Sequence, residues 1–126
     1  MRVAIRYGRD MTTLYGIRNC DTVKKARGWL EAQGLAYAFH DYKAAGVPAE
    51  RLRGWVGRLG WERLLNRQGT TFRKLAEADK ADLDAGRAVS LMLAHPSTIR
   101  RPVLESGDRL LVGFDPAAWA GALTTP

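Results

Sequence analysis

The chain has 126 residues, of which 46% are hydrophobic and 26% are charged, and its formal net charge is +7. These proportions fit one globular domain and exclude an intrinsically disordered or fibrous chain. No apolar run approaches the roughly 20 residues that span a membrane, no signal-peptide pattern is present, and a single cysteine excludes an internal disulfide. We therefore expect a cytoplasmic protein. The positive charge is compatible with an anionic small ligand, an acidic partner or nucleic acid, and equally with a solvated surface that binds nothing.

The N-terminal segment differs from the rest of the chain in its charge. Arginine occupies positions 2, 6 and 9, ahead of the first β-prone run. We expect a disordered extension over residues 1–11, followed by one domain over residues 12–126.

The first predicted elements are a strand, a loop, a helix and a second strand. Residues 12–16 are β-prone and end in a glycine, and residues 17–22 form a loop that contains Cys20. From Val23 onward apolar residues recur at helical spacing, and residues 37–42 form an aromatic-rich strand. The helix start should be capped by the polar side chains of Asn19, Asp21 and Thr22. This β-α-β order favours parallel pairing of the two strands.

The middle of the chain is predicted to be helical. Apolar stripes indicate a helix that begins with Pro48 at its first position, short turns at 61–65 and 72–75, and one or two helices over 81–94. The polar residues 66–71 form a break between them.

The C-terminal part predicts a β-hairpin and a last helix. Residues 102–105 and 109–114 flank a glycine-containing turn, and Asp115-Pro116 is a typical helix start. The whole order is β-α-β, a helical block, then β-β-α. We therefore predict an α/β protein with a thioredoxin-like fold and an all-helical insertion over about 46–98.

Cys20 is the leading candidate for chemistry. A thiol in the loop before a helix meets the positive end of the helix dipole and unpaired backbone N–H groups, which favour the thiolate. Lys24 and Lys25 act in the same direction and Asp21 opposes them, so we expect a lowered pKa for Cys20. The alternative is an inert cysteine that is buried as a small hydrophobe. Because Val23 stands where a Cys-x-x-Cys pair needs its second thiol, any turnover requires an outside thiol such as glutathione.

Two arginine-containing segments are candidate anion-binding sites. Arg101 precedes Pro102, and an X–Pro bond is where a cis peptide costs least. Arg101 can present two donors to an oxyanion or carboxylate, and the alternative is a trans proline beside a solvated arginine. The segment 66–73, which includes Arg67, can bind an anion or form only a turn. Two histidines lack partners at metal-ligand spacing, so we expect no metal site at His40 or His95.

Four segments together resemble the arsenate-reductase-like family that comprises the ArsC, Spx and YffB proteins. They are Tyr-Gly-Ile-x-Asn-Cys-Asp-Thr-x-Lys-Lys-Ala at 15–26, Phe-His-Asp-Tyr-Lys at 39–43, Leu-Asn-Arg-x-Gly-Thr-Thr-Phe-Arg-Lys-Leu at 65–75 and Pro-Ser-x-Ile-x-Arg-Pro-Val at 96–103. The resemblance covers roughly Thr12 to Leu123 and is strongest to the YffB branch. It implies a thioredoxin fold with a helical insertion, Cys20 in the active-site loop, and Arg101-Pro102 as a cis-proline step facing that cysteine.

Departures from the family pattern narrow the function that the resemblance implies. Many Spx-type regulators of RNA polymerase carry a Cys-x-x-Cys switch, which Val23 removes here. Arsenate reductases of the family hold the oxyanion with three arginines, and Arg101 matches one of them. At the other two positions this chain has Asn66, with Arg67 next to it, and Phe114. Losing two of three cations would weaken the binding of a tetrahedral oxyanion.

The YffB branch implies a glutathione-dependent thiol-disulfide reductase with one active-site cysteine, and this is the predicted function. Cys20 would be the nucleophile, and the substrate-binding residues would be Arg101, Pro102, Arg67, Asn19, Asp21, Thr22 and Lys24. No bound cofactor or metal is expected; glutathione would be the cosubstrate, with a small disulfide or glutaredoxin as partner. The alternatives are a single-cysteine arsenate reductase linked to glutathione and glutaredoxin, and an Spx-like module that binds RNA polymerase.

Overall fold

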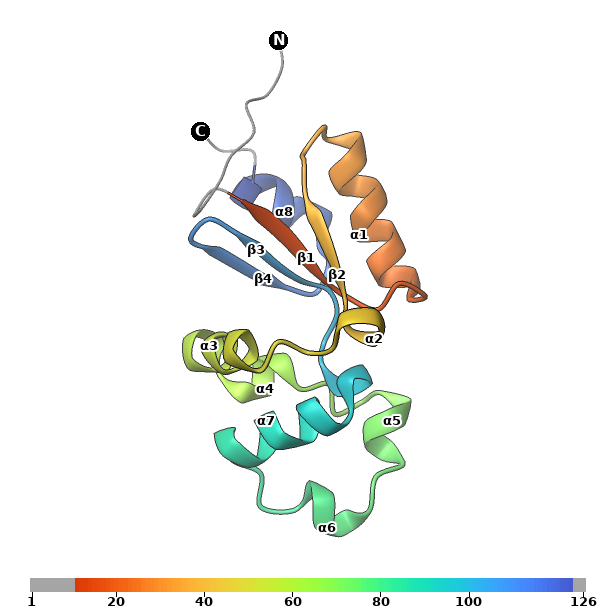
Figure 1. The fold of residues 1–126 in the computed structure, drawn as a ribbon, viewed down its shortest axis with the longest axis vertical. Helices are drawn as coiled ribbons and strands as arrows, with labels where there is room; N and C mark the ends of the chain where they lie inside the picture. Colours follow the sequence, from red (N-terminus) through yellow and green to blue (C-terminus); the bar gives the residue numbers. More distant parts are fainter. Residues whose placement is uncertain (1–10, 124–126) are drawn as a thin grey trace. The chain divides into compact units, whose positions relative to one another are not determined.

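The computed structural model describes residues 11–123, in which strands and helices follow the predicted order (Figure 1). The predicted extension over residues 1–11 falls outside this range except for Met11, whose side chain is exposed. The chain divides into two units. One contains the described residues up to Asp41 and from Arg101 onward, and the other is Tyr42–Arg100. In the described part of the chain, no helix is long and apolar enough to cross a membrane.

The first unit is a four-stranded mixed sheet with two helices. Its elements are β1 (Thr12–Gly16), α1 (Asp21–Ala32), β2 (Ala38–Asp41), β3 (Val103–Ser106), β4 (Arg109–Val112) and α8 (Pro116–Leu123). The strand order in the sheet is β2-β1-β3-β4. β1 pairs in parallel with β2, with Leu14 opposite Phe39, whereas β3 pairs antiparallel with both β1 and β4. The predicted α/β thioredoxin-like fold and the parallel pairing of the first two strands are confirmed.

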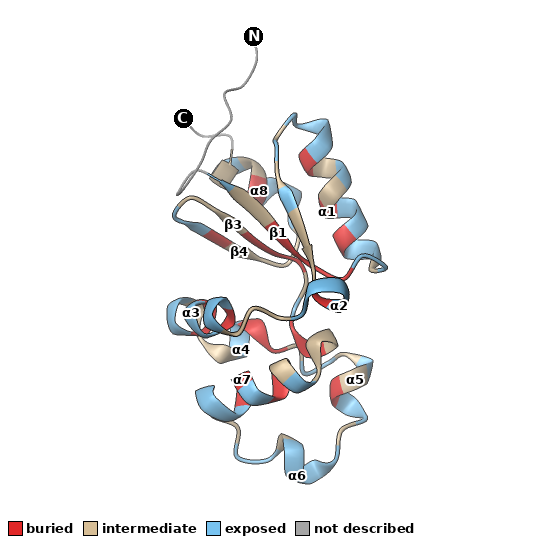
Figure 2. Cartoon of the chain, viewed as in Figure 1, coloured by how far each residue is buried: buried red, intermediate tan, exposed pale blue. Residues whose placement is uncertain are grey.

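The core of the first unit lies on one face of this sheet. Leu14 of β1 and Leu104 of β3 pack there against Trp119 of α8 and against one stripe of α1. The stripe consists of the fully buried Val23, Ala26 and Leu30, whose spacing places them on one side of a helix. Figure 2 shows buried positions in red along α1 and on the strands. Both helices therefore cover the same face, and the loop over residues 17–20 joins the end of β1 to the N-terminus of α1.

The second unit is built from helices. They are α2 (Tyr42–Ala45), α3 (Ala49–Leu59), α4 (Trp61–Leu64), α5 (Thr70–Arg73), α6 (Glu77–Lys80), α7 (Ala85–Ala94) and a 3₁₀ turn at Pro96–Thr98. Its buried interior includes Leu52, Trp55, Leu64, Leu65, Met92 and Ile99. An isolated β-bridge pairs Leu65 with Ile99 and ties the α4 end to the segment after α7. This unit corresponds to the helical insertion predicted over about 46–98.

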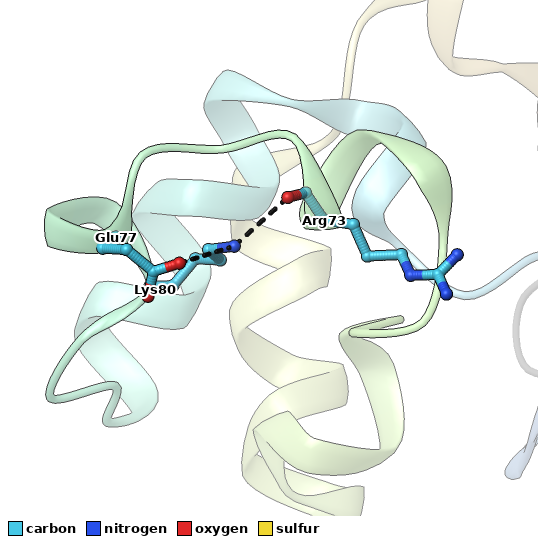
Figure 3. Close-up of polar contacts among 3 residues, drawn as sticks. All are labelled: Arg73, Glu77 and Lys80. Atoms are coloured by element: carbon cyan, nitrogen blue, oxygen red, sulfur yellow. Dashed lines mark hydrogen bonds and ion pairs between the residues drawn. The ribbon is translucent and has the colours of Figure 1, made fainter.

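Lys80 connects α6 to α5 within this unit (Figure 3). Its ammonium donates a hydrogen bond to the backbone carbonyl of Arg73 at 3.2 Å and lies 3.4 Å from a carboxylate oxygen of Glu77. The same nitrogen lies over the Phe72 ring, 5.6 Å from the ring centroid. Because α6 has no buried residue of its own, polar contacts hold this one-turn helix, and they include a hydrogen bond at 3.0 Å from the Arg87 guanidinium to the Ala78 carbonyl.

Several predicted boundaries are wrong in the N-terminal half of the chain. α1 begins at Asp21 rather than Val23, because Asp21 and Thr22 form its first turn instead of preceding it. β2 ends at Asp41, and Tyr42 begins α2 as a buried aromatic residue. Pro48 is the N-cap of α3 and not its first helical residue.

The helix predicted over 81–94 is also shorter than expected. α7 begins at Ala85 because the carboxylate of Asp84 accepts a hydrogen bond from the Arg87 N–H at 2.8 Å and caps the helix. Asp82 has a positive φ of 53°, which a continuous helix does not permit. The short α6 has no counterpart in the prediction, since its residues show no apolar stripe.

Candidate active site

Cys20 lies at the junction between β1 and α1. Its backbone is extended, with φ −125° and ψ 127°, and it occupies the N-cap position of α1. Its carbonyl accepts the first helical hydrogen bond, from the Lys24 N–H at 2.9 Å. The side chain is half-buried and packs against the edge of the core of the first unit. The thiol therefore stands at a helix N-terminus, where the positive end of the helix dipole favours an anion.

The close approach of α1 to β1 depends on Gly16. A Cβ added to Gly16 would lie 2.8 Å from Cγ2 of Val23, closer than two carbon atoms can pack. Both residues are buried. Glycine at the end of β1 thus lets the first turn of α1 rest on the strand backbone, and this contact fixes where Cys20 stands relative to the sheet.

Arg101 and Pro102 lie beside the end of β1. β3 pairs antiparallel with β1, with Val103 opposite Tyr15, so the residues just before Val103 adjoin the loop that leads to Cys20. The Arg101–Pro102 peptide bond is cis, as the family resemblance implies. Pro102 is buried, and its carbonyl accepts a hydrogen bond from the Gly113 N–H at 2.8 Å.

The surroundings of the sulfur lower the pKa of Cys20 below its ordinary value of 9.0. Partial burial is the largest single influence and raises the pKa, because it disfavours the charged thiolate. It is outweighed by the Val23 N–H, by the hydrogen bond and charge of the Arg101 guanidinium, and by the Thr22 N–H. The side chain of Cys20 closes no capping bond of ordinary geometry, so the two N–H groups act on the sulfur as dipoles pointed toward it.

The predicted direction of this shift is confirmed, and so is the predicted contribution of the backbone N–H groups at the helix start, but the predicted influence of Lys24, Lys25 and Asp21 is wrong. Lys24, Lys25 and Asp21 are exposed, and solvent screening leaves them outside the main influences on the Cys20 pKa. The cation that matters is Arg101, which belongs to a distant part of the sequence.

The other residues predicted to bind substrate near Cys20 are exposed. They are Asn19, Asp21, Thr22 and Lys24. The predicted capping of α1 by Asn19, Asp21 and Thr22 is wrong, because Cys20 itself is the N-cap. Thr22 contributes its backbone N–H to the pKa of the thiol. A role of these four side chains in substrate binding stays a prediction.

Arg67 belongs to the second unit. Its guanidinium lies over the Trp61 ring, 5.5 Å from the ring centroid. The Gln68 N–H donates a hydrogen bond to the side-chain oxygen of Asn66 at 3.1 Å, so the segment contains an Asx turn. This contact supports the interpretation of the segment as a turn. The binding of an anion by Arg67 stays a prediction.

Arg18 is a residue that the sequence analysis did not select. Its guanidinium lies over the Phe39 ring, 5.4 Å from the ring centroid. Its Nε is 3.8 Å from a carboxylate oxygen of Asp41, and its side chain is 66% exposed. Its position two residues before Cys20 is the one sequence feature that could have pointed to it. Its contacts with Phe39 and Asp41 follow only from the register of β1 against β2, in which Gly16 lies opposite Asp41.

The two histidines lie in different units. His40 packs against Tyr15, with 5.2 Å between ring centroids, and the Tyr15 hydroxyl donates a hydrogen bond to Glu105 at 2.8 Å. His95 lies in the second unit, at the end of α7. Among residues 11–123, no group of three or more His, Cys, Asp or Glu side chains is placed to hold a metal ion.

Comparison with known proteins identifies the family. Residues 15–122 match the model of the ArsC family. The chain belongs to the ArsC family. The resemblance inferred from the four sequence segments is thereby confirmed, and all four lie within the matched range.

Individual relatives of this ArsC-family protein include solved structures. A YffB protein is 61% identical, with a TM-score of 0.87, over 90% of this chain and 99% of that one. An arsenate reductase (ArsC) related protein from Brucella melitensis is 51% identical, with a TM-score of 0.71, over 95% of this chain and 100% of that one.

Two relatives are known from their sequences. A Haemophilus influenzae protein described as uncharacterized is 38% identical over 112 residues, which is 89% of this chain and 98% of that protein. The global transcriptional regulator Spx of Streptococcus mutans is 25% identical over 107 residues, which is 83% of this chain and 77% of Spx. These likenesses support a place among the thiol-based reductases and their relatives, with strong similarity to YffB.

Proposed function

We propose that this ArsC-family protein is a glutathione-dependent thiol-disulfide reductase of the cytoplasm that uses Cys20 as its only thiol. The observation that carries the proposal is the placement of the Cys20 sulfur between the N-terminus of α1 and the Arg101 guanidinium. The thiolate is the nucleophile in thiol-disulfide exchange, and both neighbours favour it over the thiol.

The proposed reaction has two exchange steps. The Cys20 thiolate attacks the glutathionyl sulfur of a mixed disulfide R–S–S–G, so a Cys20–S–S–G bond forms and R–S⁻ leaves, taking a proton from water. A glutathione thiolate then attacks the glutathionyl sulfur on the enzyme and releases the Cys20 thiolate. The sum is R–S–S–G plus GSH giving R–SH plus oxidised glutathione, in which R–S is reduced and glutathione is oxidised. The second thiol must come from outside because Val23 fills the position that a resolving cysteine would take.

Two features of the site would assist both steps. The N–H groups of Thr22 and Val23 face the sulfur, and the Arg101 guanidinium approaches it as a cation. Negative charge passes between sulfur atoms during each exchange, and fixed donors at the reacting atom stabilise that charge. Neither feature requires a bound cofactor.

A single-cysteine arsenate reductase is the second candidate, favoured by the name of the Brucella melitensis relative. Phe114 argues against it. This residue stands where the family resemblance expects an anion-binding arginine, and its ring packs edge-on against Trp119 at 4.9 Å and Trp29 at 6.2 Å between centroids. The ring packs against the core and offers an oxyanion no hydrogen-bond donor, which supports ranking disulfide exchange first.

Mass spectrometry of the intact protein tests the proposed function. Wild-type protein incubated with oxidised glutathione should gain the mass of one glutathionyl group, and Cys20→Ser should gain none. Reduced glutathione should then remove the adduct. A glutathionylated peptide should turn over in an assay that couples the formation of oxidised glutathione to NADPH consumption by glutathione reductase. Folded wild-type protein that forms no adduct would contradict the proposal.

Two further measurements separate the alternatives. Arsenate-dependent oxidation of glutathione in the presence of glutaredoxin, without turnover of the peptide, would favour the arsenate reductase. Binding of RNA polymerase that is unchanged in Cys20→Ser, without adduct formation in the wild type, would favour an Spx-like module.

A further inference from the structure

A second arginine of the first unit, Arg18, lies two residues before Cys20 in the chain. Arg18 lies in the same loop and is held by two contacts, one with the Phe39 ring at 5.4 Å from its centroid and one with Asp41, whose carboxylate oxygen is 3.8 Å from Nε. These contacts orient the guanidinium without enclosing it, because 66% of the Arg18 side chain is exposed. Arg18 is therefore positioned and accessible at the same time.

The Phe39 ring is shared with another guanidinium, that of Arg27, which lies 4.3 Å from the ring centroid. Arg27 differs from Arg18 because its Nε donates a hydrogen bond to the Tyr37 hydroxyl at 3.0 Å, and that hydroxyl donates to Glu31 at 2.8 Å. Arg27 is thus engaged in a network of the protein itself. The ion pair of Arg18 is longer than the roughly 2.7–2.9 Å of a strong charge-assisted bond, so a ligand carboxylate can compete for this guanidinium.

Arg18 and Arg101 lie on opposite sides of β1. Arg18 contacts residues of β2, whereas Arg101 precedes β3, and the strand order places β2 and β3 on either side of β1. Arg101 approaches the sulfur of Cys20 and stabilises the thiolate. Arg18 is therefore available to bind another part of the substrate.

We propose that Arg18 binds a carboxylate of glutathione, or of the glutathionyl part of a mixed disulfide, and thereby makes the site of Cys20 selective for anionic disulfides. This inference rests on the proposed function. Glutathione carries two carboxylates, and the planar guanidinium matches a carboxylate with two parallel N–H donors. Arg18 is a specificity-determining residue in this role, since it does not act on the reacting sulfur.

The test compares two disulfides on the same set of proteins. The second-order rate of Cys20 modification is measured with oxidised glutathione, which is anionic, and with bis(2-hydroxyethyl) disulfide, which is neutral. The proteins are the wild type, Arg18→Ala, Arg18→Lys and Lys25→Ala. The last variant removes the same charge from an exposed position on α1. Thermal melts followed by circular dichroism check that each protein is folded.

Arg18→Ala should react roughly three- to ten-fold more slowly with oxidised glutathione, as expected for the loss of one partly exposed charged contact. Its rate with the neutral disulfide should not change. Arg18→Lys should recover part of the rate with oxidised glutathione, because it keeps the charge, and Lys25→Ala should match the wild type with both reagents. If Arg18→Ala does not fold, Arg18→Lys serves as the test variant. Its rate with oxidised glutathione should then fall by a smaller factor, and its rate with the neutral disulfide should not change.

Two results would overturn the inference and leave the proposed function intact. One is a rate of Cys20 modification that falls equally with both disulfides in Arg18→Ala. That result would mean that the substitution perturbs the loop or the sulfur and not the binding of a carboxylate. The other is a rate with oxidised glutathione that equals that of the wild type. A wild-type protein that reacts with the neutral disulfide but forms no glutathione adduct would contradict the proposed function and this inference together.

Discussion

The guanidinium of Arg101 approaches the sulfur of Cys20 and lowers the pKa of that thiol through a hydrogen bond and through its positive charge. The two residues are far apart in the sequence, and the antiparallel pairing of β1 with β3 brings them together. The segment just before β3 thus supplies the cation, and the first turn of α1 supplies the backbone N–H groups. The thiolate therefore depends on the tertiary fold as well as on the start of α1.

Removing the Arg101 guanidinium should raise the pKa of Cys20. Arg101→Ala loses both the hydrogen bond and the charge, so the apparent pKa measured from the rate of alkylation against pH should move upward. Arg101→Lys keeps the charge without the planar donors, so its Cys20 pKa should lie between those of the wild type and Arg101→Ala. Arg109→Ala, an exposed position on β4, should leave the pKa unchanged. If Arg101→Ala titrates like the wild type, the guanidinium is not the stabilising group.

The stability of the protein should depend on pH through Cys20. The folded-state pKa lies below the ordinary value of 9.0, so the unfolded state binds the thiol proton more tightly than the folded state. The resulting stabilisation is complete above the unfolded pKa and is lost as the pH falls through the folded pKa. The free energy of unfolding of the wild type, minus that of Cys20→Ser, should therefore rise with pH up to about 9 and then level off.

Urea unfolding at a series of pH values measures this difference. In an Arg101→Ala background the rise should be smaller, because the pKa of Cys20 then lies closer to its unfolded value. A difference that stays flat across the range would show that the thiol has the same pKa in both states.

Gly16→Ala should destabilise the protein by about 1–3 kcal/mol, as an overpacked core position does. The added methyl carbon would stand 2.8 Å from Cγ2 of Val23 and force α1 away from β1. Gly28→Ala is the matched control, because nothing lies within 4 Å of its added Cβ. That substitution in an exposed helix interior should stabilise the protein by about 0.5–1 kcal/mol. Urea unfolding should thus show a lower free energy of unfolding for Gly16→Ala and a higher one for Gly28→Ala. Changes of the same sign would refute the contact with Val23.

Phe114→Arg should not create an arsenate site. The ring packs edge-on against Trp119 and Trp29, so a guanidinium there would lose aromatic contacts and need a partner; we expect a loss of about 1–3 kcal/mol in the free energy of unfolding. Phe114→Leu keeps an apolar side chain and should lose less. Arsenate-dependent oxidation of glutathione, measured on both variants, should stay at the wild-type level. A gain of that activity in Phe114→Arg at unchanged stability would mean that this position faces a bound anion.

The element order and the place of Cys20 could be predicted because their signals are local. The apolar residues Val23, Ala26 and Leu30 repeat at helical spacing, and each is fully buried on one side of α1. The start of α1 could not be predicted as well. Asp21 and Thr22 have side chains that commonly cap helices, and the local sequence does not show that Cys20 takes the N-cap position instead.

The spacing of residues along the chain does not show which side chains meet at the site; only the family resemblance implied that Arg101 faces Cys20. The influence of Arg101 on Cys20 follows from the register of β3 against β1, and the contact of Arg18 with Asp41 follows from that of β2 against β1. Register depends on interactions between distant segments, whereas helical spacing depends on neighbours. The expected influence of Lys24 and Lys25 rests on their nearness to Cys20 in the sequence, but both side chains are exposed and are not among the main influences on the pKa of Cys20.

Cys20 carries the proposed nucleophile and is also the N-cap residue of α1. Once the sulfur is bonded to glutathione it carries no negative charge, and the amides of Thr22 and Val23 lose the anion toward which they point. The first turn of α1 should then open more often, so those two amide protons should exchange with deuterium faster in the adduct than in the reduced protein. During the proposed cycle the first turn of α1 would thus be ordered in the reduced protein and frayed in the adduct.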